Sequence, residues 1–412
     1  MNSSSILSCI RCQLTYDILK IRYFCDCGGP LEVKQLQSGG TGALDLFKER
    51  LLSKAPLDRS GVWRFREFVA NLPSNEVISH SEGSINIRSS DDLSLWVDIP
   101  NLIIKHEGLN PTGSFKDRGM TVAVSVALHM KQKILACAST GNTSSSLAAY
   151  AAKAGLQSIV FLPDGKVSQG KLAQTLGFGA QVFAIKGDFD RAMSIVQTLS
   201  QEGRIYLVNS VNPFRIEGQK TIIWELLQDL DWEAPDWIFV PGGNLGNTSA
   251  FGKAIKEAFD WGWIAKKPKI VTVQAEGASP FYKSFLTGFA SIESETAETI
   301  ATAIRIGNPV NYEKAVRAIQ DTKGQVISVT DQEILNSKRK IDSAGIGCEP
   351  ASAASLAGIK KLRLSGMIKR SDRVAAILTG HMLKDVELIE NRGLYTVVEA
   401  NLDAIKSALD NI

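Results

Sequence analysis

The sequence predicts an α/β protein built on parallel sheets, and three observations support this fold class. Short apolar runs alternate with helical segments along most of the chain. Several of these runs end in turns rich in Gly, Ser, Thr and Asn, at the strand ends where parallel sheets bind ligands. The apolar fraction of 44% and the charged fraction of 22% are typical of a folded protein and exclude a mostly disordered chain. A length of 412 residues leaves room for about two or three domains.

The elements are expected in the following order. Residues 1–40 form a small separate module, which a cluster of glycines at 39–42 ends. Mixed helix and strand follow from about Leu44. Strands are predicted at residues 102–105, 134–138, 159–162, 182–185, 206–208, 237–240, 270–275 and 374–378. Helices are predicted at residues 121–130, 144–154, 171–176, 190–199, 249–259 and 401–412.

The charge balance limits the classes of partner. The formal net charge is only +3, from 46 basic and 43 acidic side chains, so nothing predicts binding to nucleic acid or to an anionic membrane. No apolar run reaches the roughly 18 residues of a membrane span. Residues 1–12 lack the basic and apolar regions of a secretory signal, so we expect a cytoplasmic protein.

Four of the six cysteines lie within residues 9–27, which indicates a local metal site and not a disulfide framework. Cys9 and Cys12 form a C-x-x-C pair, whereas Cys25 and Cys27 are one residue short of a second pair. Two C-x-x-C pairs would be a strong signal of tetrahedral zinc. Two interpretations remain open: a zinc-ribbon-like site, or a ribbon without metal that packing holds together.

Lys116 is the first candidate catalytic residue. It follows the irregular segment N-P-T-G-S-F at 110–115 and precedes an apolar helix. The positive end of that helix, and the neighbouring Arg118, would lower the pKa of the amine and make it more nucleophilic. Such a lysine suits Schiff-base chemistry. Without further motifs, an ordinary solvated lysine is the alternative.

Two turns between a strand and a helix are candidate anion sites. The first, P-G-G-N-L-G-N-T at 241–248, has glycines that let successive N–H groups point at a ligand. It matches neither the dinucleotide fingerprint nor the P-loop. The second, C-A-S-T-G-N-T at 137–143, offers hydroxyl and amide donors for a carboxylate. The alternatives are a tight turn and a helix cap. Thr379 ends a third apolar run.

In this order, the pieces resemble the threonine synthases, which are pyridoxal-phosphate enzymes of the tryptophan-synthase β-subunit fold type, fold type II. The similarity covers roughly residues 60–390. The strings that carry it are N-P-T-G-S-F-K-D-R-G at 110–119, A-S-T-G-N-T at 138–143, L-P-D-G-K at 162–166, V-N-S-V-N-P-F-R-I-E-G-Q-K-T at 208–221, P-G-G-N-L-G-N at 241–247, G-I-G-C-E-P-A-S-A-A-S at 345–355 and T-G-H-M-L-K-D at 379–385.

The resemblance implies two domains of open parallel sheets behind the Cys-rich module. The larger domain, which binds pyridoxal 5'-phosphate, would comprise residues 41–119 and 208–412. The smaller α/β domain would comprise residues 120–207 and close over the substrate. The resemblance also implies a homodimer.

The resemblance assigns a role to each matching residue. Lys116 would bind the cofactor covalently and then transfer protons. The other implied cofactor contacts are Phe115 beside the ring, Asn142 at the phenolic oxygen, Gly242, Gly243, Asn244, Leu245, Gly246 and Asn247 around the phosphate, and Thr379 at the pyridine nitrogen. The implied substrate contacts are Ser139, Thr140 and Thr143 for the α-carboxylate, and Asn209, Ser210 and Arg215 for the substrate phosphate.

The implied reaction converts O-phosphohomoserine and water to L-threonine and phosphate by β,γ-elimination and replacement. One departure concerns substrate choice: where many relatives have E-G-x-T-P-L, this chain has E-G-S-I-N-I at 82–87. Two alternatives therefore stay open. One is a related lyase, such as a threonine or serine dehydratase or a cysteate or cysteine synthase. The other is a non-catalytic protein that binds pyridoxal phosphate or an amino acid.

Overall fold

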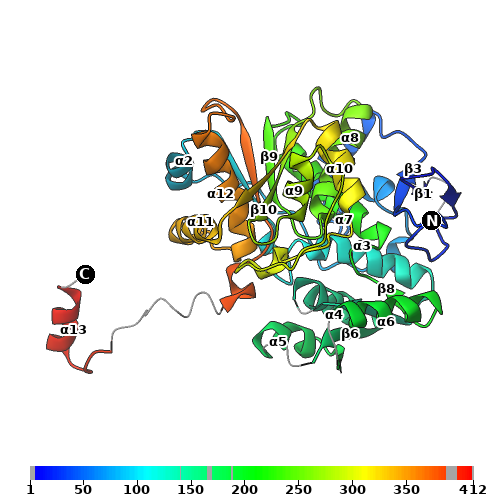
Figure 1. Cartoon of the computed structure of the whole chain (residues 1–412), viewed down its shortest axis with the longest axis horizontal. Coiled ribbons are helices and arrows are strands. Elements are labelled where there is room, and N and C mark those ends of the chain that lie inside the picture. The colour runs from blue at the N-terminus through cyan, green and yellow to red at the C-terminus, as the bar shows by residue number, and fades with distance from the viewer. Residues whose placement is uncertain (1–4, 140, 165–168, 187–188, 387–396, 411–412) are drawn as a thin grey trace.

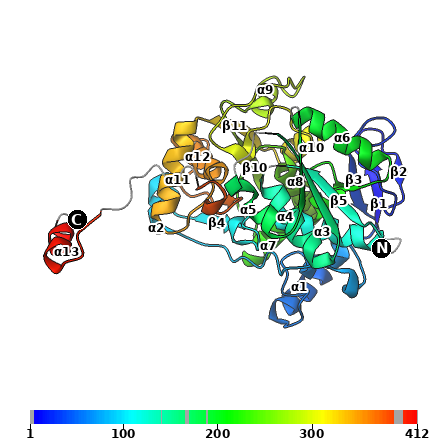
Figure 2. The same cartoon turned by 90° about the horizontal axis from the view of Figure 1, so that it is seen from below.

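The computed structural model describes residues 5–139, 141–164, 169–186, 189–386 and 397–410. Its described strands form a three-stranded antiparallel sheet and two parallel sheets, of five and four strands. The three-stranded sheet lies at the opposite end of the main body from α2 (Asp91–Val97), α11 (Asp331–Ser343) and α12 (Pro350–Leu364), as Figures 1 and 2 show. The parallel α/β architecture expected from the sequence is confirmed.

The N-terminal module is a small antiparallel sheet with strand order β2-β1-β3, in which the first strand is the central one. Its strands are β1 (Ser5–Cys9), β2 (Thr15–Tyr16) and β3 (Leu31–Gln35). Side chains of two helices of the main body, α8 (Gly246–Asp260) and α10 (Tyr312–Asp321), donate hydrogen bonds to the backbone of its last strand. Lys314 donates a hydrogen bond of 2.6 Å to the carbonyl oxygen of Leu31, and Arg317 forms an ion pair with Glu32. The module is therefore attached to the main body through β3.

The five-stranded sheet has the order β11-β10-β9-β12-β4, and every neighbouring pair is parallel. Its strands are β4 (Leu102–His106), β9 (Trp237–Pro241), β10 (Lys269–Ala275), β11 (Gln325–Val329) and β12 (Val374–Leu378). Successive residues alternate between its two faces: Ile238 and Val240 pack with α8, whereas Trp237 and Phe239 pack with α12. Both faces are covered, which explains the continuous apolar runs of these strands.

The four-stranded sheet is parallel with the order β7-β6-β5-β8. Its strands are β5 (Ile134–Ala138), β6 (Gln157–Pro163), β7 (Gln181–Ile185) and β8 (Tyr206–Leu207). One core joins it to α3 (Lys116–His129) and α4 (Asn142–Ala154), with α5 (Gln169–Gly177) beside them. A second core joins its other face to α6 (Phe189–Gln201). In Figure 1 this layer lies below the larger sheet.

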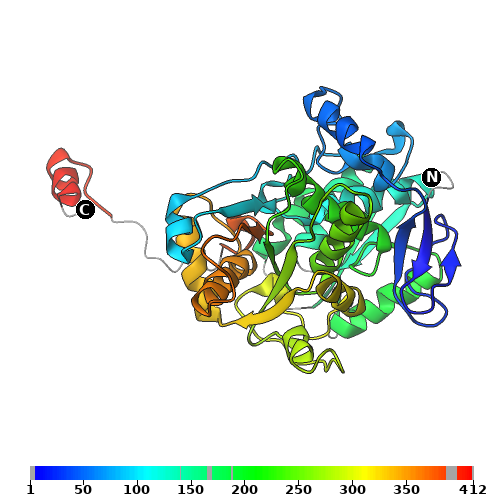
Figure 3. The ribbon, with the colours of Figure 1, turned by 90° about the horizontal axis from the view of Figure 1, so that it is seen from above.

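The remaining helices complete the main body, apart from the C-terminal one. They are α1 (Gly42–Leu52), α7 (Pro213–Asp229), α9 (Pro280–Leu286) and α13 (Leu402–Leu409), with short 3₁₀ turns at Trp63–Phe68, Ser74–Glu76, Glu107–Leu109, Thr302–Ile304 and Met382–Lys384. The helix α1 projects from one side of the body, and α13 stands apart from it (Figure 3). No helix among the described residues is both long and apolar enough to cross a membrane.

Each of the eight predicted strands overlaps a strand of the structure. The six predicted helices overlap α3, α4, α5, α6, α8 and α13. The sequence analysis missed β11 and the three strands of the N-terminal module, and it missed the helices α1, α2, α7, α9, α10, α11 and α12. For α7 the reason is physical. Every residue from Pro213 to Gln228 is buried, the charged ones included, so its polar residues do not mark a solvent-exposed face with a helical period.

Candidate active site

The candidate site lies where the carboxyl ends of strands from both parallel sheets meet. Asn142 follows β5 of the smaller sheet, and Thr379 follows β12 of the larger sheet. The carboxylate of Glu349 accepts a hydrogen bond from each of them, of 2.9 and 3.2 Å respectively. The loop before Lys116 joins the same place, because the backbone N–H of Phe115 donates to the carbonyl oxygen of Thr379 at 3.0 Å. The predicted site residues on these loops are thereby brought together.

Lys116 is the first residue of α3 and is held by the residue that follows it. The buried carboxylate of Asp117 accepts hydrogen bonds from the backbone and hydroxyl of Thr112, at 2.7 and 2.6 Å, and from Ser146 at 2.6 Å. These bonds close the irregular loop into the helix. The Nζ of Lys116 lies 4.3 Å from the ring centroid of Phe115. The half-buried amine is therefore placed by its own loop.

The environment of Lys116 makes its amine unusually acidic. The pKa of Lys116 is lowered to about 7, mainly by burial and also by the charge of Arg215, whereas the charge of Glu349 acts in the opposite direction. The predicted lowering is confirmed, but the predicted contribution of Arg118 is wrong. The Arg118 guanidinium is buried between the carboxylates of Glu107 and Glu225, at 2.6 and 2.7 Å, and its charge is matched there.

The glycine-rich turn connects β9 to α8, as the sequence predicts for residues 241–247. A Cβ added to Gly242 would lie 2.4 Å from Cγ2 of Thr272, and one added to Gly243 would lie 3.0 Å from Cα of Ile304. Leu245 adopts the left-handed conformation, with φ of 61°, just before the helix begins. The loop therefore packs closely against its neighbours, and side chains are excluded from its turn.

The backbone of this turn is supported from outside. Asn311 lies just before α10, and its backbone N–H and its side-chain amide both donate to the carbonyl oxygen of Asn244, at 3.3 and 3.2 Å. Gln274 donates to the carbonyl oxygen of Gly242 at 3.0 Å. Among the described residues, the buried Oδ1 of Asn247 finds no hydrogen-bond partner.

Arg215 is a buried cation whose guanidinium could bind an anion. It lies in the first turn of α7 with 1% of its surface exposed. One terminal nitrogen donates to the carbonyl oxygen of Val208 at 3.0 Å, whereas Nε and Nη2 have no partner in the described part of the chain. Burial lowers the pKa of Arg215 to about 10. A buried guanidinium with free N–H groups is costly unless an anion binds it.

The other residues predicted to contact the substrate have different surroundings in the structure. Thr143 is buried in the first turn of α4, and Ser139 precedes that helix. Thr140 lies outside the described residues. The side-chain amide of Asn209 bonds both the N–H and the carbonyl oxygen of Ala138, at 2.9 and 3.0 Å, so it fixes the end of β5. The carbonyl oxygen of Ser210 accepts a hydrogen bond of 3.3 Å from the side-chain amide of Asn311.

Three polar residues at the site were not assigned any role from the sequence. They are Glu349, which bridges Asn142 and Thr379, Asn311, which supports the glycine-rich turn, and Lys384, which donates to Ser145 of α4 at 3.1 Å. Glu349 and Lys384 do lie within the strings G-C-E-P-A-S and T-G-H-M-L-K-D. The sequence did offer one signal that Glu349 has a role: it is a charged residue within a run of small and apolar residues.

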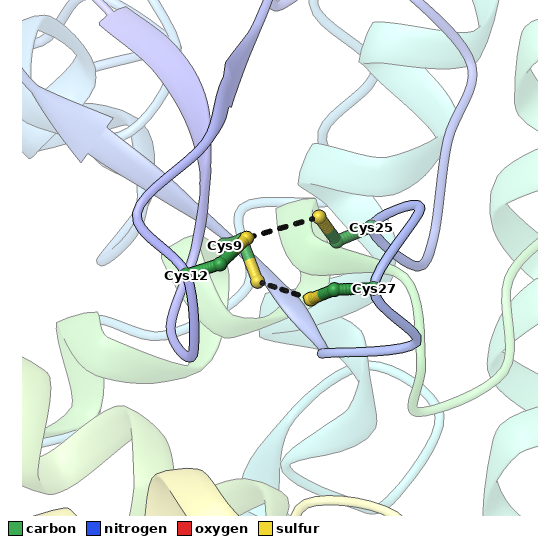
Figure 4. Close-up of side chains that lie close together, drawn as sticks. All are labelled: Cys9, Cys12, Cys25 and Cys27. Atoms are coloured by element: carbon green, nitrogen blue, oxygen red, sulfur yellow. Dashed lines mark hydrogen bonds between the residues drawn. The ribbon is translucent and has the colours of Figure 1, made fainter.

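The four clustered cysteines form a second centre, in the N-terminal module. The Sγ atoms of Cys9, Cys12, Cys25 and Cys27 all lie within 4.8 Å of one another, which is a geometry that could hold a metal ion (Figure 4). The sulfur atoms of Cys9 and Cys27, and those of Cys12 and Cys25, are 3.5 Å apart. A hydrogen bond from Tyr16 lowers the pKa of Cys25 to about 6. The sulfur atoms of the shorter C-x-C pair therefore still lie close to those of the C-x-x-C pair.

The main site fits a pyridoxal-phosphate group. An acidic lysine amine suits its aldehyde, a glycine-rich turn at a helix N-terminus suits its phosphate, and a hydroxyl at a strand end can meet its ring nitrogen. The unpartnered N–H groups of Arg215 leave a place for one further anionic group.

Comparisons with known proteins agree. Residues 78–380 match the family model of pyridoxal-phosphate dependent enzymes. The threonine synthase of Methanocaldococcus jannaschii is 43% identical over 411 residues, 98% of this chain and 99% of that protein. The threonine synthase of Methanosarcina acetivorans is 45% identical over 408 residues, 98% of each chain. The crystal structure of threonine synthase from Escherichia coli has a TM-score of 0.74 at 16% identity, covering 98% of this chain and 94% of that one, and so shares the fold. The chain therefore belongs to the pyridoxal-phosphate-dependent enzymes and, within them, to the threonine synthases.

Proposed function

We propose that the protein converts O-phosphohomoserine and water to L-threonine and inorganic phosphate with pyridoxal 5'-phosphate as cofactor. The observation that carries this proposal is the unsatisfied guanidinium of Arg215 beside Lys116. A dehydratase or a cysteine synthase acting on an unphosphorylated amino acid needs no second phosphate site. The curated relatives similar over nearly the whole chain are threonine synthases, which supports the same choice.

The cofactor would be held by Lys116, Phe115, Asn142, the turn at 242–247 and Thr379. When bound, it supplies an electron sink that acidifies the hydrogens of the substrate. The Lys116 amine moves protons between the substrate carbons. A pKa of about 7 suits this task, because the amine can both accept and return a proton near neutral pH.

The substrate would be oriented by its two anionic ends. Ser139, Thr140 and Thr143 receive the α-carboxylate at the start of α4, where the helix dipole favours negative charge. Arg215, with Asn209 and Ser210, receives the phosphate that leaves. We also propose the division into a larger domain (41–119 and 208–412) and a smaller one (120–207) that closes to exclude water until it is needed.

The test is a single assay of the purified holoenzyme supplied with O-phosphohomoserine. Phosphate release matched by threonine formation supports the proposal, and Lys116→Ala serves as the inactive control. Release of ammonia from serine or threonine, without phosphate release from O-phosphohomoserine, would favour the dehydratase alternative. Absence of the visible Schiff-base absorbance after addition of pyridoxal phosphate would favour a non-catalytic binding protein.

We further propose that Cys9, Cys12, Cys25 and Cys27 bind one zinc ion, because four thiolates in this arrangement match the ligand set of structural zinc. Elemental analysis of the protein purified without chelator is expected to find about one zinc per chain, and a Cys12→Ser variant should lose it. We also propose a cytoplasmic homodimer, as in the family resemblance; light scattering of the purified protein tests the dimer.

A further inference from the structure

Asn311 is a buried residue that contacts both of the segments proposed to bind phosphate groups. It is 2% exposed and lies just before the first turn of α10. Its side-chain amide donates to the carbonyl oxygen of Asn244, in the glycine-rich turn, at 3.2 Å. The same nitrogen donates to the carbonyl oxygen of Ser210, in the segment before α7, at 3.3 Å. One NH₂ group therefore joins the proposed cofactor site to the proposed substrate site.

The position of Asn311 is itself fixed by the helices α8 and α10. Its carbonyl oxygen accepts from the backbone N–H of Ala315 at 3.0 Å and from the hydroxyl of Ser249 at 3.3 Å. Its backbone N–H donates to the carbonyl oxygen of Asn244 at 3.3 Å. Its amide nitrogen lies 3.8 Å from the place of a Cβ added to Gly246, so the side chain packs against the glycine-rich turn. Asn311 can therefore act as a fixed point for both loops.

The two bonds of this amide determine the direction of two backbone N–H groups. A trans peptide unit is planar, and its C=O and N–H groups point in opposite directions. Because the carbonyl group of Asn244 points at Asn311, the N–H group of Leu245 points away from Asn311. The N–H group of Val211 points away from it for the same reason, because the carbonyl group of Ser210 is held. Within the described part of the chain, neither N–H group donates a hydrogen bond, so both are available to a ligand.

The surroundings of both N–H groups favour an anion. Leu245 is the residue before α8, where the helix dipole attracts negative charge. Val211 lies in the short segment that leads to Arg215, whose buried Nε and Nη2 have no partner among the described residues. Each N–H group can therefore add to a phosphate site that the chain already offers.

We propose that Asn311 is a positioning residue that aims the N–H group of Leu245 at the cofactor phosphate and that of Val211 at the substrate phosphate. One side chain thereby sets the affinity of both phosphate sites. This inference rests on the proposed function, because it takes the turn at 242–247 as the site of the cofactor phosphate and the segment at 209–215 as that of the substrate phosphate.

Gln274 provides a matched comparison, because it orients the cofactor turn alone. Its side-chain amide donates to the carbonyl oxygen of Gly242 at 3.0 Å, so the N–H group of Gly243 points away from Gln274. Its side-chain oxygen accepts from the backbone N–H of Tyr282 at 2.9 Å. In the described structure, the Gln274 side chain makes no hydrogen bond to residues 208–215. Removing the Gln274 amide should therefore affect the cofactor site and leave the substrate site unchanged.

The first experiment follows the two N–H groups directly, by NMR of the protein labelled with ¹⁵N-leucine and ¹⁵N-valine. Addition of pyridoxal phosphate to the apoprotein should shift the amide proton of Leu245 downfield, as expected for a new hydrogen bond. Addition of inorganic phosphate to the holoenzyme should then shift the amide proton of Val211 in the same direction. Leu364, which ends α12 and is 79% exposed, should not respond to either addition.

The second experiment compares Asn311→Ala with Gln274→Ala by titration calorimetry. In Asn311→Ala, two dissociation constants should rise about three- to tenfold, the usual loss for a hydrogen bond. They are those of pyridoxal phosphate for the apoprotein and of inorganic phosphate for the holoenzyme. In Gln274→Ala only the first constant should rise. A purely structural role for Asn311 at the cofactor turn predicts the same result for both variants.

A Val211 amide resonance of the wild-type holoenzyme that does not respond to inorganic phosphate would overturn the inference, whether or not Asn311→Ala folds. So would a folded Asn311→Ala variant in which only one of the two constants rises, or a Gln274→Ala variant in which both rise. A wild-type protein that captures no pyridoxal phosphate would instead overturn the proposed function together with this inference, which keeps the two failures distinguishable.

Discussion

Tyr150 donates a hydrogen bond of 2.7 Å to the carboxylate of Glu82 and thereby ties the segment E-G-S-I-N-I to the helix α4. The same carboxylate accepts from the hydroxyls of Ser60 and Ser79, at 2.6 and 2.9 Å. Further along the segment, the backbone N–H groups of Ser84 and Ile85 donate to Glu225. The departure from E-G-x-T-P-L is therefore accommodated without a loose loop.

Substituting Glu82→Gln should destabilise the protein. The amide has only one acceptor oxygen, so at least one of the buried donors around Glu82 loses its partner, which costs about 1–3 kcal/mol. Chemical denaturation measures the free energy of unfolding. Tyr150→Phe should cost less, and the double variant should cost less than the sum of the two, because both changes remove the same contact. Strict additivity would show that Tyr150 and Glu82 do not interact.

The acidity of Lys116 predicts how fast the apoprotein captures its cofactor. The neutral amine is the nucleophile, and with a pKa of about 7 its fraction rises as the pH is raised through that value. The rate of Schiff-base formation, followed by visible absorbance, should therefore increase about tenfold per pH unit below pH 7 and level off above it. A rise that continues to pH 10 would contradict the lowered pKa.

Lys116 also predicts a stability change. Because its pKa is lower in the folded apoprotein than in the unfolded chain, the unfolded chain binds more protons between about pH 7 and 10. The free energy of unfolding contributed by this group therefore rises with pH across that window. Lys116→Met should remove this rise, which denaturation of both apoproteins at pH 7 and pH 9.5 can measure.

Arg215 should be needed for phosphate recognition. In Arg215→Gln, loss of the charge-assisted hydrogen bonds is expected to cost about 1.5–3 kcal/mol, which lowers kcat/KM for O-phosphohomoserine by about 10- to 100-fold. Inhibition by inorganic phosphate should weaken in parallel. The partly exposed Arg373, which pairs with Glu233, gives the control variant Arg373→Gln. An unchanged inhibition constant for phosphate would remove Arg215 from the substrate site.

The glycine-rich turn should not tolerate a side chain at Gly242. In Gly242→Ala the new methyl would lie 2.4 Å from Cγ2 of Thr272, so the turn must shift. We expect the dissociation constant of pyridoxal phosphate to rise by at least about tenfold, since displacements near 1 Å at a site are costly. Gly42→Ala, where a Cβ meets nothing within 4 Å, is the control and should bind the cofactor normally.

Sequence patterns predicted the elements whose burial or turn geometry is visible in a short run of neighbouring residues. Short apolar runs predicted β9 and β12, and the strings around Lys116 and Gly242 predicted a lysine loop and an anion-binding turn. The pattern could not predict contacts that the topology creates. Asn142 and Glu349 are 207 positions apart and meet only because the two sheets face each other.

Closeness in sequence was also a poor guide to which charged residue affects the pKa of Lys116. Arg118 is two residues from Lys116, yet its guanidinium is neutralised by Glu107 and Glu225. Arg215, almost a hundred residues away, lowers the pKa of that amine instead. Asn209, predicted from its string to contact the substrate, also bonds the backbone of Ala138 through its side-chain amide, a contact that the string did not predict.

The position of β12 between β9 and β4 has a consequence for biosynthesis. β4, which leads into the lysine loop, pairs within its sheet only with β12, a strand encoded about 270 positions later. Chains emerge from the ribosome at about 5–20 residues per second, so β4 waits tens of seconds for its neighbour. Until residues 374–378 are available, the nascent chain has an incomplete sheet and an unanchored lysine loop. Capture of the cofactor is thus restricted to nearly full-length chains.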